Sequence, residues 1–376
     1  MTVDPLLSSL QDDLDQQLDA DYLASFALAE RLVDALTLDA LRRVGLWPSP
    51  AGSSAESLGA LADRLGTPAD RQHALAWLLE RARAVGHLER GADGAWLLGE
   101  PPAADLVARI EATLESPELA ERARLLGTSG PLLAHCAARF PEFLVGERSA
   151  ATILFKGEGL RLWSEYFSAG NGLYEPHNEL AARAVAALAT DLGRPLRILE
   201  LGAGSGGGSA AILAALGPDR VAEYVLTDLA PSLLLATQER MAALGLPPTG
   251  RRRLDFGRSL VEQGIEPASF DLVVEVNALH NCLDLQASLR WIAEILRPDG
   301  ALVLSESLCP HDRQVHQDLV FQLFPFHDGA DTRSRFDSIE GWRAACATSD
   351  AVAADCLANR TGPALAMVAV ARPRPG

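Results

Sequence analysis

Glycines cluster in one short stretch, Arg197 to Ser209, and their spacing is typical of a ligand-binding turn. Ile198 and Leu199 are apolar and favour a buried strand. The glycines that follow let the backbone take positive φ angles and approach a bound molecule closely; they are Gly202, Gly204, Gly206, Gly207 and Gly208. Ala210 to Leu216 is expected to form a helix. The stretch therefore predicts a strand, a glycine turn and a helix, as in nucleotide-type ligand sites.

The residues beside the glycines indicate which ligand is bound. The glycine pattern alone also fits G-x-G-x-x-G, so it does not separate a nicotinamide or flavin site from a site for S-adenosylmethionine. Glu200 precedes the glycines, where its charge would repel a pyrophosphate but suit a ligand with an ammonium and a sulfonium. Asp228 ends a second apolar stretch and is placed to accept hydrogen bonds from ribose hydroxyls, a feature that dinucleotide enzymes share. The charge of Glu200 favours S-adenosylmethionine.

The order of the later segments carries a family resemblance. Asp255-Phe256, the run Phe270 to His280 and the run Ile295 to Glu306 follow the glycine turn in this order. With the turn, this succession resembles the class I S-adenosylmethionine-dependent methyltransferases over roughly residues 174–372. The resemblance implies S-adenosylmethionine as cofactor and a set of cofactor-binding residues: Glu200, Gly202, Gly204, Gly206, Asp228, Leu229, Asp255, Phe256 and Asn277.

His280 is the candidate catalytic base. Methyl transfer from a sulfonium requires a nucleophile aligned with the methyl carbon, water excluded and, for some nucleophiles, a proton removed. A carbon next to a carbonyl must become an enolate, which needs a base and a group that stabilises the oxyanion. His280 follows the fourth strand of the expected sheet and titrates near neutral pH. Glu306 ends the neighbouring strand, so we expect its carboxylate to orient the imidazole.

A closer resemblance concerns the carbon-methylating domains of polyketide synthases. It is carried by Tyr174-Glu-Pro-His-Asn-Glu-Leu-Ala, Asn277-Ala-Leu-His280 and Leu-Val-Leu-Ser-Glu306, together with the glycine turn. The resemblance implies His280 as base, Glu306 as its partner, and Tyr166 or Tyr174 as a further catalytic-pocket contact. It implies methylation of a carbon next to a carbonyl in secondary metabolism, on a small-molecule or carrier-bound substrate.

A second family resemblance predicts a bound metal ion. Freestanding enzymes that methylate α-keto acids also place a helical domain before this fold, and some of them hold a metal between two histidines. By this resemblance His280 and His327 are the candidate ligands of a divalent or ferric ion, which would stabilise an enolate as a Lewis acid. His311 and His316 are rivals to His327, and a surface position is the ordinary expectation for all three.

Other functions stay open at this point. An oxygen methyltransferase for a phenol or carboxylate would use His280 alone as base. A relative of the fold that cyclises S-adenosylmethionine without transferring a methyl group is a further alternative. A nicotinamide oxidoreductase, or a silent regulator with a DNA-reading amino-terminal domain, is the last.

The pattern of elements predicts an α/β fold with a doubly wound, Rossmann-like parallel sheet, preceded by a mainly helical, winged-helix-like domain. Residues 1–100 are expected to form the winged-helix-like dimerisation domain, with a hairpin at Gly91-Ala-Asp-Gly94. Residues 101–173 are expected to form a helical connecting layer beside the substrate pocket, interrupted at Pro117, Pro131 and Pro141. Residues 174–376 are expected to bind S-adenosylmethionine, with an amphipathic helix over Glu175 to Leu192.

Composition limits the possible partners. The formal net charge of −17 argues against a nucleic-acid partner, because phosphate binding needs a basic surface. No run approaches about 18 consecutive apolar residues, and the amino terminus is acidic, so we expect a cytoplasmic protein with no membrane partner. The five cysteines have no C-x-x-C spacing and are expected to be free thiols. A homodimer formed by the amino-terminal domain is the expected assembly.

Overall fold

The computed structural model describes residues 5–47, 55–116, 119, 125–168, 170–310, 315–324 and 336–374. The chain forms two compact units. The first, here called the sheet unit, comprises residues within 1–23, 167–313 and 336–376; the second, the helical unit, comprises residues within 24–166 and 314–335. Each unit thus joins segments that are far apart in sequence. The expected boundaries at residues 100 and 173, and the dimerisation and connecting roles, stay predictions.

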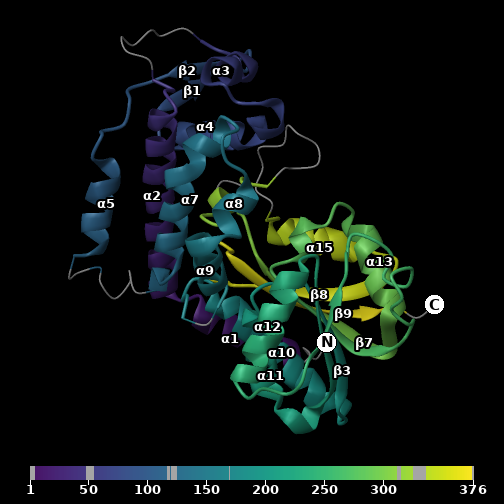
Figure 1. Ribbon diagram of the computed structural model, residues 1–376. Helices are drawn as coiled ribbons and strands as arrows, with labels where there is room; N and C mark the ends of the chain where they lie inside the picture. The colour runs from purple at the N-terminus through teal and green to yellow at the C-terminus, as the bar shows by residue number, and fades with distance from the viewer. Residues whose placement is uncertain are drawn as a thin grey trace. The chain divides into compact units, whose positions relative to one another are not determined.

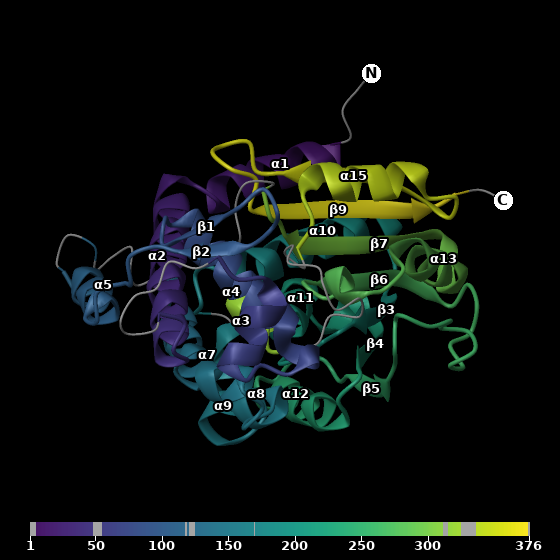
Figure 2. The ribbon, with the colours of Figure 1, turned by 90° about the horizontal axis from the view of Figure 1, so that it is seen from above.

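The sheet unit is built on seven strands in the order β5-β4-β3-β6-β7-β9-β8, of which the part from β5 to β9 can be followed in Figure 2. Their bounds are β3 Leu196–Leu201, β4 Val221–Asp228, β5 Gly250–Arg253, β6 Phe270–Val276, β7 Leu296–Ser307, β8 Val352–Ala358 and β9 Ala366–Pro373. The pairs among β5, β4, β3, β6 and β7 are parallel. This confirms the doubly wound fold, in which strand order reverses beside β3.

The last strand departs from the expected parallel arrangement. β9 pairs antiparallel with both β7 and β8. β8 and β9 are joined by a short connection rather than a helix, and antiparallel neighbours need only such a turn. The carboxyl ends of β3 to β7 still meet at one edge of the sheet.

Helices cover both faces of this sheet (Figure 1). One face packs against α1 Pro5–Gln17, α10 Glu175–Leu192, α11 Gly207–Leu216 and α12 Pro231–Ala243. The other packs against α13 Leu285–Ile295 and α15 Ile339–Thr348. Two short 3-10 helices complete the unit, η2 Pro218–Arg220 and η3 Leu279–Asn281. The helix expected over Glu175 to Leu192 is confirmed with those bounds.

The helical unit contains the expected hairpin. Its elements are α2 Ala20–Arg43, α3 Leu58–Leu65, η1 Ala69–Arg71, α4 Gln72–Ala84, β1 Leu88–Arg90, β2 Trp96–Leu98, α5 Leu106–Leu114, α7 Ser129–Leu144, α8 Ala150–Leu154, α9 Gly157–Tyr166 and α14 Asp318–Phe321, of which α2 begins in the sheet unit. β1 and β2 pair antiparallel, with Leu88 opposite Leu98. Gly94 takes a φ of 81° in the turn, a conformation that glycine adopts without strain.

Two of the expected helix breaks are wrong. Pro131 and Pro141 both lie within α7. Pro131 is in the first turn, where a backbone N–H has no partner within the helix. Pro141 lies near the other end, and the burial of Phe140 and Phe143 on either side holds the helix together there. Pro117 lies outside the described residues.

Two compositional expectations can be compared with the structure. None of the five cysteines, all of them among the described residues, forms a disulfide. In the part of the chain that the structure describes, no helix is both long and apolar enough to cross a membrane.

Candidate active site

The glycine turn joins β3 to α11 with three positive φ angles. Gly202, Gly204 and Gly206 have φ values of 66°, 52° and 80°. A Cβ atom at Gly206 would lie 2.6 Å from Thr237 Cγ2, so the close packing of α12 also requires glycine there. At Gly204 a Cβ would meet only the Gly202 carbonyl, at 3.7 Å. The turn is therefore open to a ligand at Gly204. At Gly202 and Gly206, close packing within the protein leaves no room for a side chain.

Glu200 is buried inside β3, directly before the turn. Its Oε2 accepts hydrogen bonds from the hydroxyls of Ser209 and Tyr224, the latter at 2.9 Å. Burial raises the pKa of Glu200 to about 7, although the two hydrogen bonds favour the ionised form and act in the opposite direction. A nearby cationic group would lower that pKa again. The carboxyl therefore suits a ligand with an ammonium and a sulfonium, as S-adenosylmethionine has.

Asp228 ends β4 and ties this strand to the glycine turn. Its Oδ2 accepts from the Gly204 backbone N–H at 3.0 Å, and its Oδ1 accepts from Ala230 N–H at 2.9 Å. The residue is only partly buried, and Leu229 beside it is 54% exposed. Each carboxylate oxygen has a second lone pair, so Asp228 retains capacity to accept from ribose hydroxyls.

Asp255 and Phe256 follow β5 at the same edge of the sheet. Leu254 N–H donates to the Asp228 carbonyl, which brings the segment to the end of β4. Asp255 Oδ1 accepts from Gly257 N–H at 2.9 Å, and both predicted residues are partly buried. The Phe256 ring lies 3.8 Å from the position of a Cβ on Gly202. The structure thus gathers the residues predicted to bind the cofactor around the glycine turn.

His280 lies in η3, after β6, and its side chain is 1% exposed. Its Nδ1 lies 2.7 Å from Glu306 Oε2, and its backbone N–H donates to Glu306 Oε1 at 3.0 Å. The Asn281 amide donates to His280 Nε2 at 2.8 Å and to the Ala278 carbonyl at 3.2 Å. The bond to a carbonyl identifies Asn281 Nδ2 as the donor. His280 therefore carries its proton on Nδ1, and Nε2 is the unprotonated nitrogen that a base requires.

Tyr174 and Asn277 lie side by side at the entrance to α10. Tyr174 precedes the helix, is buried, and lies beside the Asn277 side chain; burial raises its pKa. Asn277 takes a φ of 51°, and its Oδ1 accepts from Ser307 N–H at 2.6 Å. The turn after β6 is thereby fixed to the end of β7, next to Glu306. Asn277 is predicted to bind the cofactor, and here its side chain accepts from Ser307 N–H and lies beside Tyr174.

Several predicted residues fall elsewhere. Tyr166 is buried in the helical unit, whereas Tyr174 belongs to the sheet unit with His280. His316 was expected at the surface, but it is 1% exposed in the helical unit, with its ring 5.1 Å from that of Phe26. The expected surface position is wrong because Phe26 and Glu30 of α2 pack against the His316 ring. His327 and His311 lie outside the described residues.

The metal prediction has no support from the described residues, among which no group of three or more His, Cys, Asp or Glu side chains is arranged to hold an ion. Because His327 is not described, the pair of His280 with His327 stays a prediction.

The sequence reasoning missed two residues at this edge of the sheet. Tyr224 donates to Glu200, and Glu275 lies fully buried on β6 beneath the His280 turn. An acid inside the apolar run Phe270–Val276 was the available signal for Glu275. Tyr224 lies within the strand β4, and its sequence neighbourhood does not distinguish it from an ordinary core residue.

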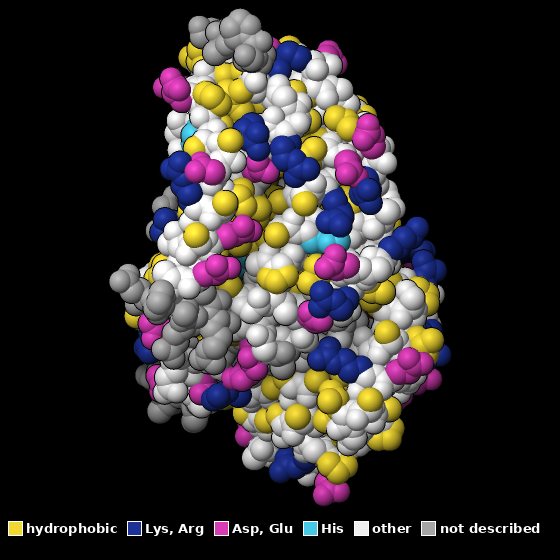
Figure 3. Space-filling view, turned by 60° about the vertical axis from the view of Figure 1, so that its left-hand side comes forward, with side chains coloured by type: hydrophobic (Ala, Val, Ile, Leu, Met, Phe, Trp, Pro, Cys, Tyr) yellow, Lys and Arg dark blue, Asp and Glu magenta, His cyan; other side chains and the backbone are white. Residues whose placement is uncertain are grey.

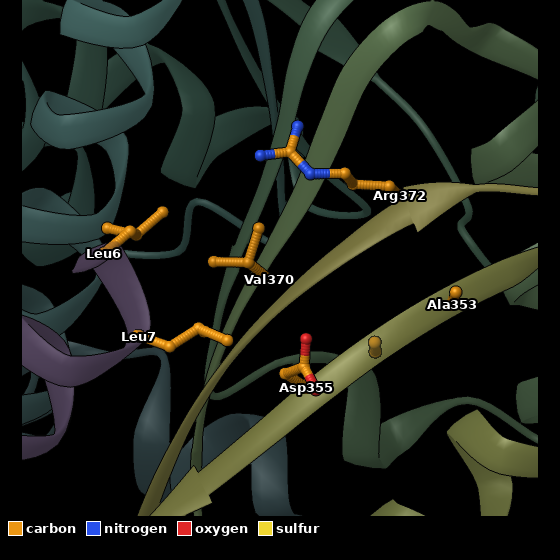
Figure 4. A pocket seen from close by; sticks show the side chains of 7 residues that line it. Leu6, Leu7, Ala353, Asp355, Val370 and Arg372 are labelled. Carbon is orange, nitrogen blue, oxygen red and sulfur yellow. The ribbon is translucent and has the colours of Figure 1, made fainter. Parts of the chain in front are cut away.

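Two cavities lie outside these residues. One, of about 240 Å³, is shown in Figure 4 with Leu6 and Leu7 of α1 facing Val370 and Arg372 of β9. The other, of about 280 Å³, lies in the helical unit and is lined by residues that include His73 and Phe155. Neither is lined by a predicted site residue. On the face in Figure 3, acidic and basic side chains are interspersed.

Comparison with known proteins agrees with this geometry. Residues 199–302 match the family model described as a methyltransferase domain. The chain is 35% identical over 177 residues, 45% of its length, to the polyketide synthase ThaQ of Burkholderia thailandensis. It is 30% identical over 308 residues, 77% of its length, to the pyochelin synthetase PchF of Pseudomonas aeruginosa. It spans only 8% and 16% of these two much longer proteins.

Solved structures share the fold over nearly the whole chain. The CurJ carbon methyltransferase superposes with a TM-score of 0.82 and 22% identity, covering 98% of this chain and 97% of that one. The DszA carbon methyltransferase gives 0.79 and 24%, covering 99% and 97%. At these identities the likeness shows the fold. Residues 199–302 therefore belong to a methyltransferase domain, and the chain as a whole shares the fold of these two carbon methyltransferases.

Proposed function

We propose that this chain methylates a carbon next to a carbonyl, in an α-keto acid or an acyl substrate used in secondary metabolism. The observation that carries the proposal is the buried pair of His280 and Glu306, with Nδ1 and Oε2 2.7 Å apart and Nε2 in its unprotonated form. The similarity to regions of the polyketide synthase ThaQ and the pyochelin synthetase PchF supports it, as does the fold shared with two carbon methyltransferases.

A carbon nucleophile explains why a buried pair is needed. The proton on a carbon next to a carbonyl is weakly acidic, so the base must be both positioned and stabilised after it takes the proton. Here His280 Nε2 takes the proton, and the imidazolium that forms lies against the negative charge of Glu306. In this structure the Asn281 amide occupies the Nε2 lone pair, so Asn281 must turn aside when substrate binds.

The cofactor site lies at the same edge of the sheet. S-adenosylmethionine supplies an electrophilic methyl group on its sulfonium when it is bound. We assign the ammonium to the surroundings of Glu200 and the ribose to Asp228. The adenine is assigned to Leu229, Asp255 and Phe256. Tyr174, which lies beside Asn277, is the assigned contact to the substrate oxygen on which negative charge develops.

We further propose that the substrate is a small molecule or is bound to a carrier, and that the protein is a cytoplasmic homodimer. These proposals are supported by the similarity to regions of a polyketide synthase and a pyochelin synthetase and by the sequence pattern of the amino-terminal region. Sedimentation of the purified chain measures the oligomeric state.

The decisive experiment uses S-adenosylmethionine with a deuterated methyl group. The chain is incubated with α-keto acids, acyl thioesters and phenols, and product mass and proton NMR locate the label. We expect the label on carbon next to a carbonyl. A label found only on oxygen would refute the proposal.

The same assay tests the base. His280→Ala is expected to lower kcat by about 10²- to 10⁴-fold while cofactor affinity stays within about twofold. His87→Ala is the matched control, since His87 lies beside the hairpin of the helical unit, where its ring Nδ1 contacts the Glu100 carbonyl. Unchanged turnover in His280→Ala would remove the base assignment.

A further inference from the structure

Glu275 is an acid enclosed in an apolar strand. All seven residues of β6, Phe270–Val276, are buried, and Glu275 is 0% exposed. It pairs in register with Leu304 of the neighbouring β7, so Glu306 lies two residues further along that strand. A buried carboxyl is costly unless it is neutral or its oxygens are hydrogen-bonded.

The two oxygens of Glu275 have different surroundings. Oε1 accepts from the backbone N–H groups of Ala278 and Leu279, the second at 2.9 Å, and so shapes the turn that leads to His280. Oε2 is buried and receives no hydrogen bond from the donors of the described residues, and this side chain lies against the carboxyl of Glu306 on the neighbouring strand. A carboxylate can only accept, so a bond between two carboxyls requires a proton on one of them.

The surroundings of Glu306 decide which carboxyl holds that proton. Glu306 accepts from the Nδ1–H and the backbone N–H of His280. Nδ1 must be the donor, because the Asn281 amide donates to Nε2. Glu306 is therefore an acceptor on both oxygens, as an ionised carboxylate is, and the proton between the two acids belongs to Glu275.

The other titratable groups near Glu275 are consistent with this assignment. They are Glu306 of β7, His280 of η3, Tyr174 before α10 and Cys282 after η3. Burial raises the pKa of Tyr174, and that of Cys282 to about 11, so both are neutral at pH 7. Burial and the charge of Glu306 raise the pKa of Glu275.

We propose that Glu275 is a positioning residue for the reaction, which in its acid form donates a hydrogen bond to Glu306 and holds that carboxylate, ionised, against His280 Nδ1. The chain of bonds runs from Glu275 through Glu306 to His280, whose Nε2 is left as the base. This inference rests on the proposed function for its effect on turnover, but the proton on Glu275 is a property of the resting protein.

Two substitutions separate the acid form of Glu275 from the ionised form. Glu275→Gln keeps an oxygen for the two backbone N–H groups and an N–H for Glu306, so kcat is expected to stay within about threefold of the natural protein. Glu275→Leu keeps a similar side-chain volume but removes the hydrogen bonds to the turn and the donor to Glu306. It is expected to lower kcat by about 10- to 100-fold with KM and cofactor affinity unchanged, because Glu306 loses a charge-assisted donor.

The pH profile distinguishes positioning from a structural role in the turn. Without the donor, Glu306 is protonated more readily, so the acidic limb of kcat in Glu275→Leu is expected to move to higher pH. A residue that only shaped the turn would lower activity at every pH without moving the limb. An unmoved limb, an unchanged kcat in Glu275→Leu, or a Glu275→Gln variant as inactive as Glu275→Leu would overturn the proposal.

A spectroscopic measurement tests the proton without any turnover. Infrared difference spectra at pH 7, natural protein minus Glu275→Gln, are expected to show the C=O stretch of a protonated carboxylic acid. Glu223→Gln is the control, since Glu223 is an exposed acid paired with Arg197 at 2.8 Å and should show no such band. Absence of the band for Glu275 would refute the inference even if carbon methylation is confirmed. Its presence would support the inference even if Glu275→Leu fails to fold or the substrate is not a carbon acid.

Discussion

The substitution Glu306→Gln tests the electrostatic half of the proposed base. Glu306 is 0% exposed and accepts two hydrogen bonds from His280, one from Nδ1 at 2.7 Å and one from the backbone N–H at 3.0 Å. A glutamine of equal volume can accept only one of these through its oxygen. Its NH2 group would face the other donor, and the negative charge opposite the imidazolium would be lost.

The size of the effect follows from that charge. Two unit charges about 4 Å apart attract by about 4 kcal/mol at an effective dielectric constant of about 20. A hydrogen bond to a charged group contributes about 1.5–3 kcal/mol, which overlaps with the same interaction. We therefore expect Glu306→Gln to raise the activation barrier by about 2–4 kcal/mol, which lowers kcat about 30- to 1000-fold.

The assay is single-turnover methyl transfer with saturating cofactor, with calorimetry to check that S-adenosylhomocysteine still binds. The pH at which activity is lost is a second readout. Burial raises the pKa of Glu306, and the hydrogen bonds from Glu275 and from the His280 backbone N–H lower it, so the ionisation of this carboxyl depends on these donors. The acidic limb that it contributes in the natural protein should be absent from Glu306→Gln. A kcat within about threefold of the natural protein would refute the reasoning, because the imidazolium would then need no counter-charge.

The remaining predictions concern the cofactor site. Because burial raises the pKa of Glu200 from 4.5 to about 7, its neutral form stabilises the cofactor-free protein below pH 4.5, and this advantage is lost as the pH rises through about 7. In the same range the affinity for cationic S-adenosylmethionine should rise, and Glu200→Gln should abolish both trends in calorimetry and thermal unfolding. Asp228→Ala should weaken cofactor binding by roughly 1–3 kcal/mol, since it removes acceptors both for the ribose and for Gly204 N–H; equal affinity by calorimetry would contradict this. Gly206→Ala should lower the free energy of unfolding by about 1–3 kcal/mol, because φ is 80° and the new Cβ would lie 2.6 Å from Thr237 Cγ2, and a denaturant titration that shows no loss would contradict the packing described.

Local pattern was enough to predict much of the sheet unit. The glycine turn, the helix Glu175–Leu192 and the strands that carry Glu200, Asp228 and Glu306 depend on short runs of apolar residues broken by glycine. Such runs are read directly from sequence. Parallel strands also align their carboxyl ends, so the proximity of His280 and Glu306 followed from their positions after neighbouring strands.

Other features depend on residues that are distant along the chain. Pro141 remains inside α7 because of the packing around it, and His316 is buried against Phe26 and Glu30 of α2. The first 23 residues and the last strands join one unit although more than 300 residues separate them. Sequence patterns indicate the local preference for helix or strand, whereas packing between residues distant along the chain decides these features.

By itself, then, the sequence predicted the fold and the proximity of His280 and Glu306, because both follow from local periodicity and from the fixed geometry of parallel strands. It predicted the cofactor class through the charge of Glu200 and the family resemblance. Only the tertiary structure decided the hydrogen bonds of the pair His280 and Glu306. The proton on His280 Nδ1 is fixed by the Asn281 amide, and the support from Glu275 is fixed by the contact between β6 and β7. Hydrogen bonds between buried side chains depend on where each strand places its neighbours, and no local pattern specifies that placement.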